Sequence, residues 1–130
     1  MKHILLIATG GTIASRSTGA GLSPQISADE LLSYIPEAKS LYRINVIQPF
    51  SLDSTNIFWK HWLLLSGLIQ KNYDLYDGFV LCHGTDTMAY TAAALSYLIQ
   101  NSPKPIVVTG AQKPIDLPDT DARTNLIDSI

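Results

Sequence analysis

Two short polar segments carry the side chains in this sequence that are best suited to covalent chemistry. The first, Thr9 to Thr12, places the Thr12 hydroxyl after two glycines, and the second, His83 to Asp86, places the Thr85 hydroxyl beside the Asp86 carboxylate. A threonine hydroxyl becomes a useful nucleophile only when a nearby group accepts its proton. No base stands next to Thr12 in the sequence, so the fold must supply the partner.

Both segments follow apolar runs that are typical of strands buried on both faces of a parallel sheet. The predicted strands are Ile4–Ala8, a strand within Leu41–Phe50, Phe79–Cys82 and Pro105–Thr109. The turns that follow these strands contain glycines or hydroxyl side chains: Thr9–Thr12, Ser51–Asn56, His83–Asp86 and Thr109–Ala111. Because parallel strands end at one edge of their sheet, we expect these turns to meet there, where glycines let the backbone approach a ligand.

Helical patterns alternate with the strands. Ser27 and Glu30 form a capping box that predicts a helix from Ala28 to about Ile35, ending before Pro36. Thr55 or Asn56 is the expected N-cap of the next helix, whose apolar stripe includes Trp62, Leu65 and Ile69. Two more helices are predicted at Asp86–Gln100 and Ala122–Ile130, and Arg16–Pro24 is predicted to be a loop.

This alternation predicts an α/β fold with a doubly wound, mainly parallel sheet and helices on both faces, similar to flavodoxin. With 130 residues, the chain is expected to form one domain, residues 1–130. The sequence stops within a helical pattern that has no C-cap signal, which we interpret as a sign that the parent protein is longer.

The composition argues against several classes of protein. A net charge of −2 provides no basic face for phosphates, so a nucleic-acid partner is not expected. The single cysteine, Cys82, forms no internal disulfide and fits a reducing, cytoplasmic compartment. No apolar run is long enough to span a bilayer, so no membrane partner is expected either.

The motifs predict no metal and no other cofactor. Gly10 and Gly11 lack the spacing of a dinucleotide-binding loop, there is no Walker lysine, and no histidine has a second ligand three or four residues away. No nucleophile elbow is present, although a Ser-His-Asp arrangement formed by the fold stays open. On local grounds alone, Thr85–Asp86 and Ser54–Thr55 also fit helix caps, and His83 and Cys82 fit buried structural roles.

Two ordered motifs in the sequence resemble the signature segments of bacterial-type L-asparaginases. They are Thr9-Gly10-Gly11-Thr12-Ile13-Ala14 and His83-Gly84-Thr85-Asp86-Thr87-Met88. The resemblance continues through Asp53-Ser54-Thr55, Thr109-Gly110-Ala111 and Asn125-Leu126, and so covers nearly the whole chain as the N-terminal domain of that family. The stretches Tyr76–Val80 and His83–Ala92 are more similar to its cytoplasmic, type I branch.

The resemblance implies roles for individual residues. Thr12 would attack the side-chain amide of L-asparagine and form an acyl-enzyme, with Thr85 as the second catalytic threonine beside Asp86. Asp86 would also bind the α-ammonium group of the substrate. The remaining substrate-binding positions that the resemblance implies are Ser54, Thr55, the backbone at Gly11 and Gly84, and the Ala111 carbonyl. L-Aspartate and ammonia would be the products.

The sequence also departs from the family pattern. The family places a tyrosine in the loop after the first motif, and the alignment puts Leu22 there. The lysine that completes the family's Thr-Asp-Lys group, and the smaller C-terminal domain that helps close the site in a homodimer or homotetramer, would lie beyond residue 130. Three alternatives to an asparaginase therefore stay open: an inactive amino-acid-binding fragment, the amidase component of a tRNA-dependent amidotransferase, and a nucleotide binder.

Overall fold

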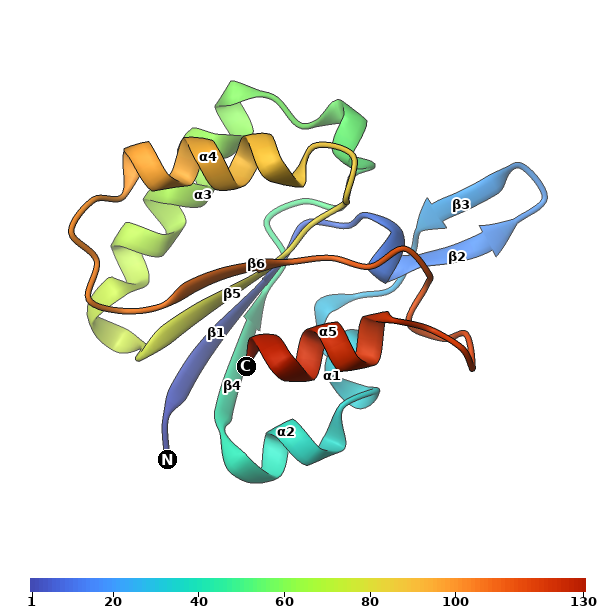
Figure 1. The fold of residues 1–130 in the computed structure, drawn as a ribbon, viewed down its shortest axis with the longest axis horizontal. Coiled ribbons are helices and arrows are strands. Elements are labelled where there is room, and N and C mark those ends of the chain that lie inside the picture. Colours follow the sequence, from blue (N-terminus) through green and yellow to red (C-terminus); the bar gives the residue numbers. More distant parts are fainter.

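A computed structural model describes all residues from 1 to 130 and shows a four-stranded parallel sheet (Figure 1). The order across the sheet is β4-β1-β5-β6. The strands are β1 (His3–Ala8), β4 (Arg43–Ile47), β5 (Gly78–Cys82) and β6 (Ile106–Thr109). The predicted α/β fold with a parallel sheet is confirmed, and each predicted apolar run contains the corresponding strand.

Helices cover both faces of this sheet (Figure 1). One face packs on α1 (Ala28–Ser33), α2 (Pro36–Leu41) and α5 (Ala122–Ser129), and the other on α3 (Trp59–Asn72) and α4 (Met88–Leu98). Along β1, Ile4 and Leu6 enter the first core whereas Leu5 and Ile7 enter the second, as the alternation of side chains along a strand requires. The continuous apolar sequence of β1 is thus explained by burial on both faces.

The strand order creates a switch point at the carboxyl ends of β1 and β5. From β1 the chain first crosses to β4 on one side, and it later returns to β5 on the other side of β1. The segments that leave β1 and β5 therefore turn toward opposite faces of the sheet and leave a crevice between them, which is where open α/β sheets bind ligands.

The expected loop at residues 16–24 is a β-hairpin, so that prediction was wrong. Strands β2 (Ser15–Thr18) and β3 (Gly21–Pro24) pair antiparallel and extend away from the sheet (Figure 1). At the tip the Thr18 hydroxyl donates to the Gly21 carbonyl (2.6 Å), and Gly21 has φ +115°. The segment is polar and lacks apolar alternation because the hairpin packs little of its surface on the core, and this hid the strands.

The helix predicted from residue 28 to 35 is shorter, and Pro36 begins a second helix. The Ser27 hydroxyl accepts the Glu30 N–H (3.2 Å), as the capping box predicts. The Glu30 carboxylate does not complete the box, because it pairs with Arg16 on the hairpin. Helix α1 ends at Ser33, and α2 starts at Pro36, where proline's fixed φ suits the first turn of a helix.

The predicted cap of α3 was also wrong, because a short 3₁₀ helix precedes α3. This helix, η2 (Ser54–Asn56), is capped by Asp53, while α3 begins at Trp59 with Phe58 as its N-cap. Helix α4 is shorter than predicted and has Thr87 as its N-cap. Two further 3₁₀ helices are η1 (Thr12–Ala14) and η3 (Tyr73–Leu75). None of the helices has the length and apolar character needed to cross a membrane.

Candidate active site

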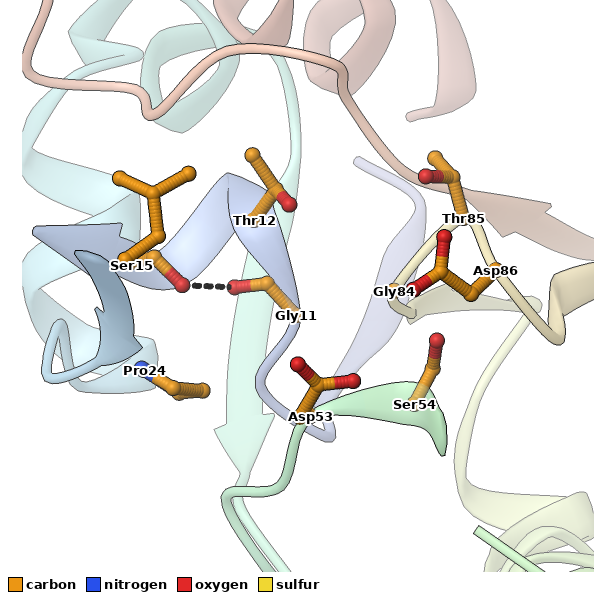
Figure 2. A pocket seen from close by; sticks show the side chains of 10 residues that line it. Gly11, Thr12, Ser15, Pro24, Asp53, Ser54, Gly84, Thr85 and Asp86 are labelled. Carbon is orange, nitrogen blue, oxygen red and sulfur yellow. Dashed lines mark hydrogen bonds between the residues drawn. The ribbon is translucent and has the colours of Figure 1, made fainter. Parts of the chain in front are cut away.

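A pocket of about 320 Å³ lies at the switch point between β1 and β5 (Figure 2). Ligand pockets typically enclose ~300–1,000 Å³, so this one suits a small molecule. Its walls come from the segments after β1, β4 and β5 and from the hairpin. The lining residues are Gly11, Thr12, Ser15, Leu22, Pro24, Asp53, Ser54, Gly84, Thr85 and Asp86.

The first wall is the turn from β1 into η1. Gly10 and Gly11 both have positive φ, +104° and +77°, which side chains disfavour. The turn also passes close to the neighbouring loop, since a Cβ on Gly11 would lie 2.4 Å from the Gly84 Cα. The Ser15 hydroxyl donates to the Gly11 carbonyl (2.7 Å) and holds the turn (Figure 2). This geometry sets Thr12 at the mouth of the pocket.

The second wall is the start of η2. Asp53 Oδ1 accepts both the N–H and the hydroxyl of Thr55, each at 2.9 Å, which leaves Oδ2 without a partner in the chain. Ser54 is buried, and its hydroxyl oxygen accepts the Thr87 N–H (3.3 Å). The proton of the Ser54 hydroxyl is therefore free to be donated to a ligand.

The third wall is the loop after β5, which contributes Gly84, Thr85 and Asp86. In Figure 2 the Thr85 side chain faces Thr12 across the hollow, and the Asp86 carboxylate lies between Thr85 and Ser54. Neither threonine hydroxyl nor the Asp86 carboxylate forms a hydrogen bond with another group of the chain. Because Thr87 is the N-cap of α4, the interpretation of Thr85 and Asp86 as helix caps is wrong. These three polar groups have no structural partner and are available to a ligand.

The pocket is acidic. Its lining contains two carboxylates, Asp53 and Asp86, and no lysine, arginine or histidine. The pKa of Asp53 is held below its ordinary value by the hydrogen bond from the Thr55 backbone, with a further contribution from the Thr55 hydroxyl. Such a site attracts an ammonium group and repels phosphate, which disfavours the nucleotide-binding alternative.

The structure brings together six of the eight residues predicted for the site, namely Gly11, Thr12, Ser54, Gly84, Thr85 and Asp86. Thr55 and Ala111 do not line the pocket. The Thr55 hydroxyl is taken up by Asp53, and Ala111 is buried behind the loop that follows β6. The roles assigned to all eight residues stay predictions.

Sequence reasoning missed three residues of the lining: Ser15, Pro24 and Asp53. Asp53 was noted only as part of the family resemblance, although an acidic residue before Ser54-Thr55 is also a cap signal. Ser15 and Pro24 are brought in by the hairpin, which was not predicted. The hairpin also places Leu22, the residue aligned with the family's tyrosine, against the pocket with 52% of its surface exposed.

The buried imidazole of His83 provides a prediction about pH. Burial lowers the pKa of His83 below its ordinary value of 6.5, against the opposing effect of the hydrogen bond with the Gly84 carbonyl. Below about pH 6.5 the unfolded chain therefore binds a proton that the folded chain rejects, and stability falls as pH falls, by up to about 1.4 kcal/mol per unit. We expect urea midpoints measured between about pH 7 and 5 to fall more steeply for the wild type than for His83→Asn. Equal slopes would contradict this.

Comparisons with known proteins agree with the fold and the motifs. The family model described as "Asparaginase, N-terminal" matches residues 3–130. The chain is 41% identical over 124 residues to the L-asparaginase of Thermococcus kodakarensis, covering 95% of this chain and 38% of that protein. It is equally, 41%, identical over 134 residues to a glutamyl-tRNA(Gln) amidotransferase component of Pyrococcus abyssi, covering all of this chain and 30% of that one.

A solved structure gives the same result. L-asparaginase I of Vibrio cholerae superposes with a TM-score of 0.87 at 37% identity, over 98% of this chain and 39% of that one. The chain thus spans well under half the length of these relatives. The resemblance inferred from the two motifs is confirmed: this chain belongs to the asparaginase family and corresponds to its N-terminal domain.

Proposed function

We propose that the protein carrying this chain hydrolyses the side-chain amide of L-asparagine to L-aspartate and ammonia. The observation that supports this most is the pocket in which Thr12, Thr85 and Asp86 converge with unpaired polar groups (Figure 2). Covalent catalysis needs a hydroxyl that is free to attack, and an amino-acid substrate needs an anionic contact for its ammonium group. The pocket offers both.

The substrate contacts follow from the charges of the walls. The Asp86 carboxylate binds the α-ammonium group of asparagine. The Ser54 hydroxyl, whose proton is free, donates to the α-carboxylate together with backbone N–H groups near Gly11 and Gly84. The Thr55 hydroxyl assists once it leaves Asp53, and the Ala111 carbonyl accepts from the amide at the rim. With both ends of the amino acid bound, the side chain points at Thr12 and Thr85.

The reaction proceeds in two steps. The Thr12 oxygen attacks the amide carbon and loses its proton to a base that acts through Thr85, giving a tetrahedral intermediate whose oxyanion is stabilised by backbone N–H groups. The C–N bond breaks, the nitrogen takes up a proton and ammonia leaves an ester on Thr12. Water then attacks this ester, and L-aspartate and the free hydroxyl are regenerated. The base and the cation that would complete the site belong to residues beyond 130 and to a partner protomer of a homo-oligomer in the cytoplasm.

Ammonia release from L-asparagine by the purified protein tests this proposal. We expect turnover with L-asparagine, and a parallel assay with L-glutamine measures the preference between the two amides. Calorimetry with L-aspartate provides the control: binding without turnover would show an amino-acid-binding chain rather than an enzyme. Absence of both binding and turnover would contradict the proposal.

The two carboxylates of the pocket give a matched pair of variants. Asp86→Asn removes the contact with the α-ammonium group, and we expect KM for L-asparagine to rise by about 10–100-fold, the value of a hydrogen bond to a charged group. Asp53→Asn keeps the Asp86 contact, and its main expected cost is about 1 kcal/mol of stability through the cap of η2. Steady-state kinetics and urea unfolding distinguish the two. A larger rise in KM for Asp53→Asn than for Asp86→Asn would reverse the assignment.

A second function is supported by the relatives named as components of a glutamyl-tRNA(Gln) amidotransferase, since one of them is as similar as the L-asparaginase. In that case the same pocket would release ammonia for amidation of a tRNA-linked amino acid. The two functions differ in what turnover requires. Hydrolysis of free L-asparagine by this protein alone supports the asparaginase, whereas ammonia release that depends on tRNA and a partner protein supports the amidotransferase.

A further inference from the structure

A buried chain of hydrogen bonds runs from α3 to the loop that carries Thr85 and Asp86. His83 and Thr91 are both completely buried. His83 Nδ1 lies 2.7 Å from the Gly84 carbonyl oxygen, and His83 Nε2 lies 2.8 Å from the Thr91 hydroxyl. The same hydroxyl accepts the indole N–H of Trp62 at 3.0 Å. The proposed reaction uses none of these three side chains.

The chemistry of the end groups fixes every proton in this relay. A carbonyl oxygen can only accept, so His83 Nδ1 carries a proton and donates it to Gly84. The Trp62 indole can only donate, so the Thr91 oxygen accepts there and its own proton points to His83 Nε2. The imidazole is therefore neutral and protonated at Nδ1. Burial, which lowers the pKa of His83, favours the same state.

The relay acts on the peptide that joins Gly84 to Thr85. In a trans peptide the C=O and N–H point in opposite directions, and the chain has no cis bonds. Because His83 holds the Gly84 carbonyl in the protein interior, the Thr85 N–H points away from the imidazole. This N–H has no partner in the chain. The direction of the Gly84 carbonyl thus sets the orientation of Thr85, including its hydroxyl, at the pocket.

We propose that His83 is a positioning residue that orients the Gly84–Thr85 peptide, and with it the Thr85 N–H and hydroxyl, for the amino-acid ligand. The proposal rests on the function proposed above. His83 touches no substrate atom and acts only through the loop. The Thr91 hydroxyl and the Trp62 indole fix its ring and its tautomer, so that α3 and α4 help to hold the site.

The decisive comparison is His83→Asn with His83→Leu. The two side chains have nearly the same shape, but only asparagine can present an N–H where the imidazole has Nδ1. A role limited to filling space would favour leucine or treat both alike. We expect the dissociation constant for L-aspartate, measured by calorimetry, to rise by about tenfold for His83→Leu, the worth of one buried hydrogen bond, and to stay within about threefold for His83→Asn.

Two further readouts keep the test decisive. Long-range ¹H–¹⁵N NMR of the wild-type chain should show a protonated Nδ1 and an unprotonated Nε2 at His83, and the opposite tautomer would overturn the proposal. The Thr85 amide resonance should move in His83→Leu and stay near its wild-type position in His83→Asn. If His83→Leu fails to fold, His83→Gln replaces it, because glutamine reaches Thr91 but offers no donor at the Nδ1 position.

The outcomes separate this proposal from the proposed function. Equal effects of leucine and asparagine on the Thr85 resonance and on affinity would overturn the positioning role while leaving the asparaginase intact. If the wild type fails to bind L-aspartate, the proposed function fails, and the tautomer and the Thr85 resonance still decide whether His83 orients the peptide.

Discussion

Replacing Thr12 with alanine should reduce ammonia release from L-asparagine by about 10⁴-fold or more, the usual cost of deleting a catalytic nucleophile. Thr12 lies at the mouth of the pocket, and its hydroxyl has no hydrogen bond with the chain. Its removal should therefore leave the fold and its stability nearly unchanged. An ammonia assay, with circular dichroism to confirm folding, measures both effects.

Two control variants sharpen this prediction. Thr12→Ser keeps a hydroxyl and should retain measurable turnover, whereas Thr12→Val keeps the shape and should be as inactive as Thr12→Ala. Thr85→Ala should also lose turnover, because Thr85 faces Thr12 across the pocket (Figure 2). Wild-type kcat in Thr12→Ala would remove Thr12 from the mechanism and leave Thr85 as the hydroxyl to test.

Replacing Gly11 with alanine should destabilise the fold by about 4 kcal/mol or more, an exceptional cost for a single methyl group. The new Cβ would lie 2.4 Å from the Gly84 Cα and 2.5 Å from the Gly84 nitrogen, and Gly11 also has φ +77°. Backbone atoms cannot move aside as a flexible side chain can, so the loops after β1 and β5 would separate. Urea unfolding measures the loss of stability.

Gly67 provides the matched control. It lies within α3, and a Cβ there would meet nothing within 4 Å. Gly67→Ala should therefore stabilise the protein by about 1 kcal/mol through helix propensity alone. If Gly11→Ala were as stable as the wild type, the close contact between the two loops would not exist in solution, and the pocket would need another geometry.

The fold was predictable where one physical effect dominates. The runs Ile4–Ala8 and Phe79–Cys82 are apolar because both sheet faces are covered, and burial alone identifies them as strands. The hairpin at Ser15–Pro24 was not predictable in this way, because its strands pair with each other and pack little against the core. Boundaries also shifted where two caps compete, as at Asp53 and Phe58 before α3.

The site was predictable to the extent that topology determines it. Because parallel strands end at one edge, Thr12 and Thr85 could be expected to meet although seventy-three residues separate them. Which side chain is free at that edge could not be deduced from the sequence. The Thr55 hydroxyl is occupied by Asp53, whereas Asp86 is released because Thr87 caps α4. Such competition among neighbouring hydrogen bonds depends on distances that only the structure provides.

The central claim, a covalent ester on Thr12, can be tested by trapping it. The protein is mixed with L-asparagine, quenched in acid within the first turnovers, digested and examined by mass spectrometry. We predict an aspartyl adduct on the peptide that contains Thr12, and its absence from Thr12→Ala and Thr12→Val. An adduct on Thr85, or steady ammonia release by the wild type with no adduct on Thr12 at any quench time, would contradict the account.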